Sequence, residues 1–154
     1  MVSEWTDSWT RFGGTDRQYH YNDIWSFDLR SRKWTELQCI GHIPSPREGH
    51  AAAIVDDVIY VFGGRGIDGK DLGDLAAFKI SSTYRSDLVK PKLSLMICHV
   101  EQRWFRFENM GPTPSGRSGH AMAAMGTKVF VLGGESFVPS REDDSDFIHV
   151  LESS

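Results

Sequence analysis

Three glycine doublets each follow a short apolar run, and this arrangement constrains the fold more than any other feature of the sequence. The apolar runs span residues 9–12, 58–62 and 129–132. The doublets that close them are Gly13 and Gly14, Gly63 and Gly64, and Gly133 and Gly134. Because glycine lacks a Cβ, a doublet lets a strand end in a sharp turn. The chain therefore consists of repeats in which each apolar strand ends in the same way.

The similarity between the second and third repeats extends beyond the doublets. Residues 44–51 read Pro-Ser-Pro-Arg-Glu-Gly-His-Ala and align without a gap to residues 114–121, Pro-Ser-Gly-Arg-Ser-Gly-His-Ala. After each doublet come a loop and an alternating strand that begins with aspartate, at residues 23–29, 74–80 and 146–151. A tryptophan-containing strand follows the first two of these, at residues 33–37 and 103–107. The pattern predicts four short strands per repeat.

The second repeat has all four of these strands. Residues 50–55 form strand one, and Asp56 and Asp57 form a two-residue hairpin connection to strand two at residues 58–62. Strand two is apolar on both faces, so both faces of its sheet must be covered. Stacking such sheets radially around an axis covers every face. We therefore predict an all-β protein built from β-propeller blades, each with four antiparallel strands.

The doublets, the proline-rich segment before His50 and His120, and the later Trp34 and Trp104 together resemble the kelch repeat over nearly the whole chain. The resemblance implies a propeller of roughly six or seven blades, of which this chain holds about three, so it forms an incomplete ring. We expect three domains. Residues 1–37 form a blade lacking its first strand, residues 38–107 form a blade with an insertion at about 81–101, and residues 108–154 form a blade lacking its fourth strand.

The insertion at residues 81–101 has neither helical nor strand periodicity, and it is long for a connection within one blade. Two interpretations remain open: a functional insertion, or a small intron retained in frame. In either case the repeat pattern does not require the segment, so we expect its deletion to leave the blade at least as stable.

Composition narrows the classes of function. Seventeen Lys and Arg against twenty-one Asp and Glu give a net charge of −4 without a long run of one sign, which argues against nucleic-acid binding. No apolar run is long enough to span a bilayer, and the first residues lack the pattern of a secretion signal. Cys39 and Cys98 have no spaced partner for zinc. We expect a cytoplasmic or cortical protein with protein partners and no cofactor.

The motifs that could carry chemistry have structural interpretations. Residues 64–69 match G-x-G-x-x-G, but a strand follows instead of the helix that a dinucleotide site needs. His50 and His120 occupy equivalent positions and are interpreted as structural residues, not metal ligands. Arg47 and Arg117 precede them, and a guanidinium with five donors suits a clamp on open carbonyls, with a ligand anchor as the alternative.

The remaining prominent side chains also have structural interpretations. Trp34 and Trp104 are expected to fill gaps between blades. Asp68, Asp71 and Asp74 lack the spacing of a calcium loop, which favours solvated loop charge. No Gly-x-Ser-x-Gly elbow is present, and no catalytic, cofactor-binding or metal-binding residue is predicted.

The candidate binding face follows from strand direction. Successive antiparallel strands reverse, so the connections between strands two and three lie on the same face as those between strands four and one. The former are residues 15–22, 65–73 and 135–145, and the latter are residues 38–46 and 108–116. Long loops on a rigid scaffold usually carry binding function. The candidate protein-binding residues are Asp16, Arg17, Tyr19, Arg65, Asp68, Lys70, Asp71, Arg141, Glu142 and Asp143.

The kelch resemblance implies a protein-interaction scaffold or adaptor in cell polarity or cytoskeletal organisation. The alternative is a galactose-oxidase-like or specifier-type enzyme on the same propeller, because fold alone does not determine function. Such an enzyme needs metal ligands or an acid–base set near the axis, and the sequence favours neither. The outer faces of the first and last blades lack neighbours, which indicates a fragment, a truncated gene model or, less readily, an assembly of several chains. We expect the isolated chain to be poorly soluble or self-associated.

Overall fold

The structure is a computed structural model that describes residues 8–81, 101–107, 113–136 and 148–152. Every regular element in these residues is a strand, in agreement with the predicted all-β class. The strands are β1 Ser8–Thr15, β2 His20–Asp28, β3 Lys33–Glu36, β4 Ile40–Gly41, β5 Arg47–Glu48, β6 Ala51–Val55, β7 Val58–Phe62, β8 Arg65–Gly66, β9 Leu75–Ser81, β10 Glu101–Arg106, β11 Ala121–Met125, β12 Lys128–Leu132 and β13 Ile148–Glu152.

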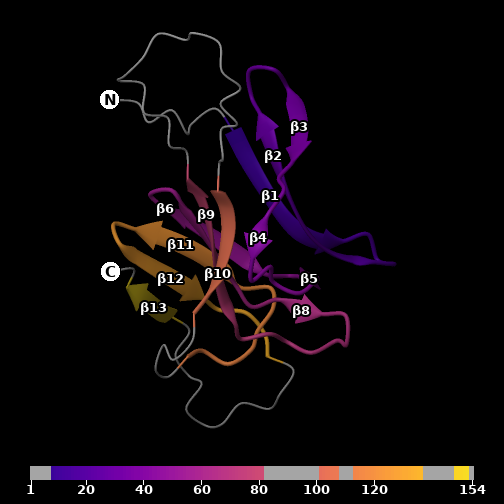
Figure 1. Ribbon diagram of the computed structural model, residues 1–154. Coiled ribbons are helices and arrows are strands. Elements are labelled where there is room, and N and C mark those ends of the chain that lie inside the picture. The colour runs from indigo at the N-terminus through magenta and orange to yellow at the C-terminus, as the bar shows by residue number, and fades with distance from the viewer. Residues whose placement is uncertain (1–7, 82–100, 108–112, 137–147, 153–154) are drawn as a thin grey trace, which may run out of the picture.

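The strands form three main sheets that lie side by side, and a small fourth sheet pairs β5 with β8 (Figure 1). The first sheet has the order β1-β2-β3, the central sheet β4-β10-β9-β7-β6, and the third sheet β11-β12-β13. Strands β6, β7, β9 and β10 are antiparallel neighbours in the order that a four-stranded blade requires. The short strand β4 adds to β10 in parallel. None of the described sheets closes into a ring, which agrees with the predicted incomplete propeller.

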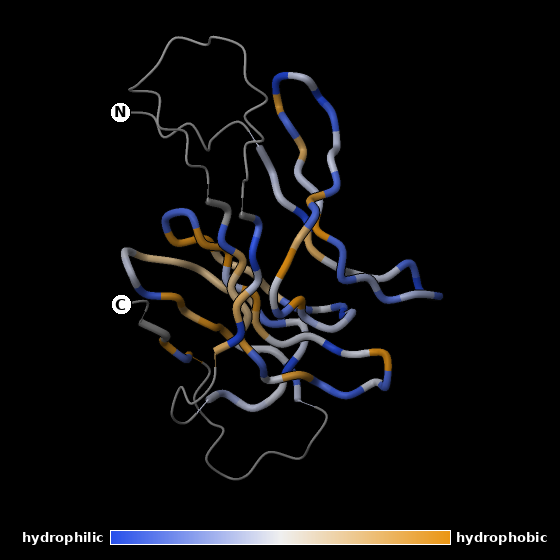
Figure 2. Tube along the Cα trace, in the orientation of Figure 1, coloured by the Kyte–Doolittle hydropathy of each residue, from blue (hydrophilic) through white to orange (hydrophobic). Residues whose placement is uncertain are grey.

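Both faces of the central sheet are buried because its second strand is apolar on both sides. In β7, Val61 and Ile59 point to one face while Tyr60 and Phe62 point to the other, as the period of two requires. The first face packs against the first sheet and the second face packs against the third sheet. Figure 2 shows the apolar residues gathered in these stacked strands and the polar residues in the loops. The two cores hold the three sheets together.

The β6–β7 hairpin forms as the sequence predicts. Val55 pairs with Val58, and Asp56 adopts a φ of 53° in the two-residue connection. Positive φ values are what tight hairpin turns of this kind require, and aspartate tolerates them better than most residues. The strand itself begins at Ala51 instead of His50, and the His50 ring packs edge-on against Phe12 of the first sheet.

Two connections differ from their expected lengths. The loop expected at residues 15–22 is only residues 16–19, because β1 and β2 continue pairing past the glycine doublet through an irregularity between Phe12 and Gly14. The segment expected as a loop at residues 38–46 contains β4, whose residues pair with Arg103 and Trp104 of β10. The backbone groups of both segments thereby find partners within sheets.

The expected insertion lies almost entirely outside the described residues, but its ends are placed. Ser81 of β9 pairs directly with Glu101 of β10. Strands β9 and β10 are therefore antiparallel neighbours in the sheet, and residues 82–100 connect them in the sequence.

Candidate functional site

The tip of the β1–β2 hairpin and the loop after β8 extend to the same side of the molecule (Figure 1). The first connects β1 to β2, and the second connects β8 to β9. The segment that enters the central sheet, residues 42–47, lines a pocket together with residues 71–74 of the second loop. We call this side, formed by residues 16–19, 42–47 and 65–74, the loop face.

The turn at residues 16–19 is ordered by one carboxylate. Asp16 Oδ1 accepts hydrogen bonds from the backbone N–H of Gln18 at 2.9 Å and of Tyr19 at 2.8 Å, and the Tyr21 hydroxyl donates to Oδ2 at 2.8 Å. The Tyr19 amide and then the Tyr21 hydroxyl lower the pKa of Asp16, because they stabilise its ionised form. The carboxylate thus holds a fixed turn that presents the exposed side chains of Arg17 and Tyr19.

The loop at residues 65–74 is also ordered by its own hydrogen bonds. The amide of Gly69 donates to the carbonyl of Gly66 at 3.0 Å, and the amide of Gly66 donates to the carbonyl of Lys70 at 3.0 Å. The tip places Ile67 in solvent, beside the exposed ion pair of Asp68 and Lys70 at 3.2 Å. Ile67 is therefore an exposed apolar side chain at the tip of an ordered loop.

The interpretation of Asp71 and Asp74 as solvated charges is wrong. The side chain of Asp71 is 2% exposed and its Oδ1 lies 3.1 Å from Nε of Arg65. Asp74 binds the buried Arg47. Buried carboxylates are stable in proteins when a cation pairs with them. Asp71 therefore supports the loop from inside, and its side chain is not available for direct contact with a partner.

Arg47 uses every one of its donors within the chain. Its Nη1 donates to Asp74 Oδ1 at 2.7 Å and to the Gly63 carbonyl at 3.0 Å, and its Nη2 donates to Asp74 Oδ2 at 2.9 Å. Ser45 takes the remaining two, its carbonyl from Nε at 3.0 Å and its Oγ from Nη2 at 3.1 Å. A guanidinium has five N–H donors, so Arg47, which is 1% exposed, has none left for a ligand. This geometry supports the clamp interpretation over the ligand anchor.

Arg117 repeats most of this arrangement in the third repeat. Its Nε donates to the Ser115 carbonyl at 3.2 Å, its Nη2 to Ser115 Oγ at 3.2 Å and its Nη1 to the Gly133 carbonyl at 3.0 Å. The counterpart of Asp74 in the alignment of the repeats is Asp146, which lies outside the described residues. The repeated arginine joins the segment entering a sheet to the glycine doublet of that same sheet.

His50 and His120 connect each sheet to the one before it. Nε2 of His120 lies 3.0 Å from the carbonyl of Phe62, so it is the protonated nitrogen that donates there. The ring also meets the Phe62 ring edge-on, and His50 meets the Phe12 ring of the first sheet in the same way. Burial lowers the pKa of both histidines, and the charges of Arg47 and Arg117 lower them further. Both imidazoles are therefore neutral near pH 7.

The two tryptophans of the repeat pattern differ in environment. Trp104 is 1% exposed and lies between the first and central sheets, with ring centroids 4.9 Å from Phe12 and 5.0 Å from Phe78. Trp34 is 52% exposed, and its ring centroid lies 5.0 Å from that of Phe27 in its own sheet. Trp34 does not fill a gap between described sheets, because no described sheet covers that side of the first sheet.

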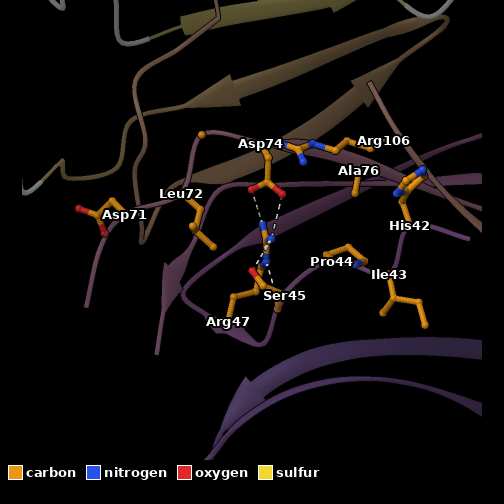
Figure 3. A pocket seen from close by; sticks show the side chains of 11 residues that line it. His42, Ile43, Pro44, Ser45, Arg47, Asp71, Leu72, Asp74, Ala76 and Arg106 are labelled. Carbon is orange, nitrogen blue, oxygen red and sulfur yellow. Dashed lines mark hydrogen bonds and ion pairs between the residues drawn. The ribbon is translucent and has the colours of Figure 1, made fainter. Parts of the chain in front are cut away.

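A pocket of about 470 Å³ opens on the loop face (Figure 3). The ion pair of Arg47 and Asp74 lies in it, and the exposed His42, Ile43 and Arg106 line it as well. The charge of Arg47 is balanced by Asp74 inside the pocket. Arg106 adds a further positive charge at the pocket wall, which favours an anionic group on whatever binds there.

Three of the candidate binding residues, Arg141, Glu142 and Asp143, lie outside the described residues. Among the residues that are described, no group of three or more His, Cys, Asp or Glu side chains is placed to hold a metal ion. The same residues contain no helix that could cross a bilayer.

The sequence reasoning missed the acidic partner of Arg47. The sequence indicates this partner, because an arginine precedes the first strand of the second and third repeats, and an aspartate begins the third strand of every repeat. A cation and an anion that recur together at fixed repeat positions indicate a pair in space.

Comparison with known proteins identifies the family. A profile described as the KLHDC2/KLHL20/DRC7 Kelch-repeats domain matches residues 1–134. The chain belongs to the kelch-repeat family. Its stacked antiparallel sheets are therefore kelch blades in an incomplete propeller, as the sequence predicted. The limits of the individual blades remain predictions.

Several kelch proteins are similar to this chain over most of its length. Tip elongation aberrant protein 3 of Schizosaccharomyces pombe is 40% identical over 141 residues, covering 81% of this chain and 12% of the relative. Tip elongation aberrant protein 1 of the same yeast is 34% identical over 113 residues, covering 73% and 8%. The Bos taurus Rab9 effector protein with kelch motifs is 32% identical over 124 residues, covering 80% and 29%. The chain thus spans less than a third of the length of these relatives.

Proposed function

We propose that this chain is a protein-interaction module that binds its partner through the loop face. The observation that carries the proposal is the pair of self-ordered turns that hold Tyr19 and Ile67 in solvent on one side of the molecule. A preordered turn loses little conformational entropy on binding, so its exposed apolar side chains contribute efficiently to affinity. Tyrosine and arginine are also enriched among the residues that dominate binding energy.

The charges of the loop face suggest the chemistry of the partner. Arg17 on the first turn and Arg106 at the pocket are exposed cations, and Ile43 and Ile67 are exposed aliphatic residues. Asp68 and Lys70 balance one another. A partner segment with an apolar residue next to acidic residues would satisfy both features.

The named relatives support a role in cell organisation. Two of them are tip elongation proteins and one is an effector of Rab9. By similarity to these proteins, we propose that the chain acts as a scaffold or adaptor in cell polarity or cytoskeletal organisation, in the cytoplasm or at the cell cortex.

Two charge-introducing substitutions on the loop face and one matched control test the proposal. Proteins captured by the wild-type chain from an extract of its own cells would be quantified and compared with those captured by Arg17→Glu and by Ile67→Asp. The control is Lys79→Glu, which reverses an exposed cation near the far end of β9, away from the loop face. Exposed substitutions seldom change stability by more than about 0.5 kcal/mol, so the variants should melt alike.

We expect both loop-face variants to lose the same partners at least tenfold, while Lys79→Glu retains them. If all three variants retain every partner, the loop face is not the binding surface. If Lys79→Glu alone loses them, binding lies at the opposite end of the blades.

A further inference from the structure

The pocket on the loop face contains an arginine that the described fold does not use. Arg106 is the last residue of β10, it is exposed, and its side chain forms no hydrogen bond or ion pair with the residues that the structure describes. Figure 3 shows this side chain reaching toward Asp74 along the pocket. A guanidinium has five N–H donors, so Arg106 can donate all of them to a molecule that enters the pocket.

The other ionised side chains at the pocket neutralise one another. Arg47 Nη1 lies 2.7 Å from Asp74 Oδ1, and Arg65 Nε lies 3.1 Å from Asp71 Oδ1. Neither pair has a net charge, so Arg106 gives the pocket its excess positive charge. A concave site with such an excess attracts an anionic group.

The repeat pattern assigns no structural role to Arg106. When Trp34 of the first repeat is aligned with Trp104 of the second, Glu36 occupies the position of Arg106. The clamp arginine before the first strand is, by contrast, the same in the second and third repeats. A charge that reverses between repeats is not needed to build a blade, which leaves Arg106 available for recognition.

The apolar side chains of the pocket suit the stem of a short acidic residue. Ile43, Pro44, Leu72 and Ala76 border its volume of about 470 Å³. Methylene groups that pack on these side chains are removed from water, which favours binding. A carboxylate at the end of the same stem can then pair with Arg106.

The pocket lies between the two turns that carry Tyr19 and Ile67. Its segment of residues 42–47 is bonded to the first sheet, because Asn22 Nδ2 donates to the Pro44 carbonyl at 3.1 Å. The same segment continues into β5, which pairs with β8 directly before Ile67. A partner segment that contacts both turns must therefore cross the pocket with the middle of its chain, so that it presents a side chain there instead of a chain end.

We propose that the pocket binds the side-chain carboxylate of a glutamate or aspartate within a partner segment, held by a bidentate pair with Arg106. The planar fork of a guanidinium matches the two oxygens of a carboxylate, which the ammonium group of a lysine does not. Since the pocket belongs to the loop face, its role as a carboxylate site rests on the proposed function.

Three short peptides distinguish the two sources of a carboxylate. Acetyl-Ser-Glu-Ile-amide has a side-chain carboxylate, acetyl-Ser-Gln-Ile with a free C-terminus has a terminal carboxylate of equal charge, and acetyl-Ser-Gln-Ile-amide has neither. Each would be titrated into the isotope-labelled chain while NMR follows the side-chain Nε–H resonance of Arg106, which is identified by its loss in Arg106→Lys. We expect a saturable shift with the glutamate peptide and at least about tenfold weaker binding of the other two.

Two arginine-to-lysine substitutions make a matched pair. Arg106→Lys keeps the positive charge but removes the planar fork, so its affinity for the glutamate peptide should fall at least about fivefold. Arg32→Lys is the control, because Arg32 is exposed on the turn between β2 and β3, at the opposite end of β2 from the loop face. Backbone amide shifts of residues 71–74 report the affinity of both variants, and circular dichroism checks their folding.

Other results would overturn the proposal. Equal affinity for the peptide with the free C-terminus would mean that the pocket recognises a chain end. Equal affinity in Arg106→Lys would mean that charge alone attracts the peptide. Shifts of similar size at Arg32 and at Arg106 would show a general attraction of anions to exposed arginines.

The capture experiment with the loop-face variants separates a failure of the carboxylate pocket from a failure of the proposed function. Loss of partners in Arg17→Glu and Ile67→Asp, without glutamate-specific binding at Arg106, supports the loop face and overturns the carboxylate pocket. Glutamate-specific binding at Arg106, with every partner retained in those variants, supports the carboxylate pocket and overturns the loop face as the binding surface.

Discussion

Residues at equivalent positions of the repeats meet different neighbours, and this difference determines what each one contributes. Gly63 and Gly133 both have a φ of +65°, which L side chains rarely adopt. A Cβ on Gly63 would lie 2.6 Å from the Arg117 carbonyl and 2.8 Å from the His120 ring, whereas a Cβ on Gly133 would meet no described atom within 4 Å. A substitution therefore strains the backbone at both positions, but it causes a steric clash with described atoms only at Gly63.

This pair of glycines gives a controlled prediction of stability. Gly133→Ala should cost about 1 to 2 kcal/mol, because it adds only the strain of a left-handed residue. Gly63→Ala should cost at least about 1 kcal/mol more, because the carbonyl of the entering segment and His120 must also move. Urea unfolding of both variants measures the difference. Equal losses of stability in the two variants would mean that the Arg117 carbonyl and the His120 ring move away from the new Cβ without a measurable cost in free energy.

The two interface histidines predict a dependence of stability on pH. Burial lowers the pKa of His50 and His120 below the ordinary value of 6.5. Between the folded and unfolded values the unfolded chain binds more protons, so the free energy of unfolding falls as pH decreases. The stability is fully present above about pH 6.5 and is lost as the pH falls toward the folded values.

Melting curves from pH 7.5 to pH 5 would show the effect. The double variant His50→Gln and His120→Gln should be less stable at pH 7.5 but should have a flatter profile, because the amide does not titrate in this range. An unchanged slope in the variant would assign the pH dependence to other groups.

At the scale of elements, strand pairing holds the central sheet in register on both sides of a long insertion. Ser81 and Glu101 pair directly, and five further pairs continue along β9 and β10 as far as Ala76 and Arg106. Trp104 lies on β10 and is buried against Phe12. This strand pair is thus anchored by its own register and by the first sheet.

Replacing residues 82–100 by Asn-Gly should therefore leave the fold intact. Asn-Gly is the preferred two-residue hairpin turn, and the shorter connection lowers the entropy cost of closure by up to about 2 kcal/mol. Melting temperature and urea unfolding would show equal or greater stability. A sharp loss of stability would mean that the segment packs on the blade and is a functional insertion.

At the scale of the whole molecule, the stack of sheets makes stability depend on what covers its two ends. The central sheet is buried on both faces, while the first and third sheets each have one face that no described residue covers. A species that binds only the folded chain raises its apparent stability by mass action. The self-association expected from the sequence would therefore make the free energy of unfolding depend on protein concentration.

The melting temperature of the wild type should rise by several degrees between about 1 μM and 100 μM, because a domain of this size gains roughly 2 to 4 °C per kcal/mol of stabilisation. Scanning calorimetry at several concentrations measures this. Val150→Glu places a charge on the uncovered face of the third sheet, so this variant should melt at the same temperature at every concentration. A concentration-dependent melt in Val150→Glu would place the association elsewhere on the surface.

Much of the fold was predictable because its signals are local and repeated. The glycine doublets, the Asp56–Asp57 connection and the aspartate and tryptophan strands recur, and each depends on backbone geometry that a few adjacent residues determine. Comparison with known proteins confirmed the kelch family, and the structure agreed with the all-β class. The loop of residues 15–22 was predicted too long, because pairing continued past the doublet through an irregularity that periodicity does not reveal.

What the sequence by itself determined is the order of strands within each repeat, since hydrophobic period and turn residues are properties of neighbouring positions. Only the tertiary structure decided whether individual side chains are buried or exposed. Asp71 and Asp68 read alike in sequence, yet one is buried against Arg65 and the other lies in solvent. Trp34 and Trp104 occupy equivalent positions, yet one is exposed and the other buried. The physical reason is that burial depends on which sheet lies opposite, and that neighbour comes from residues far away in the chain.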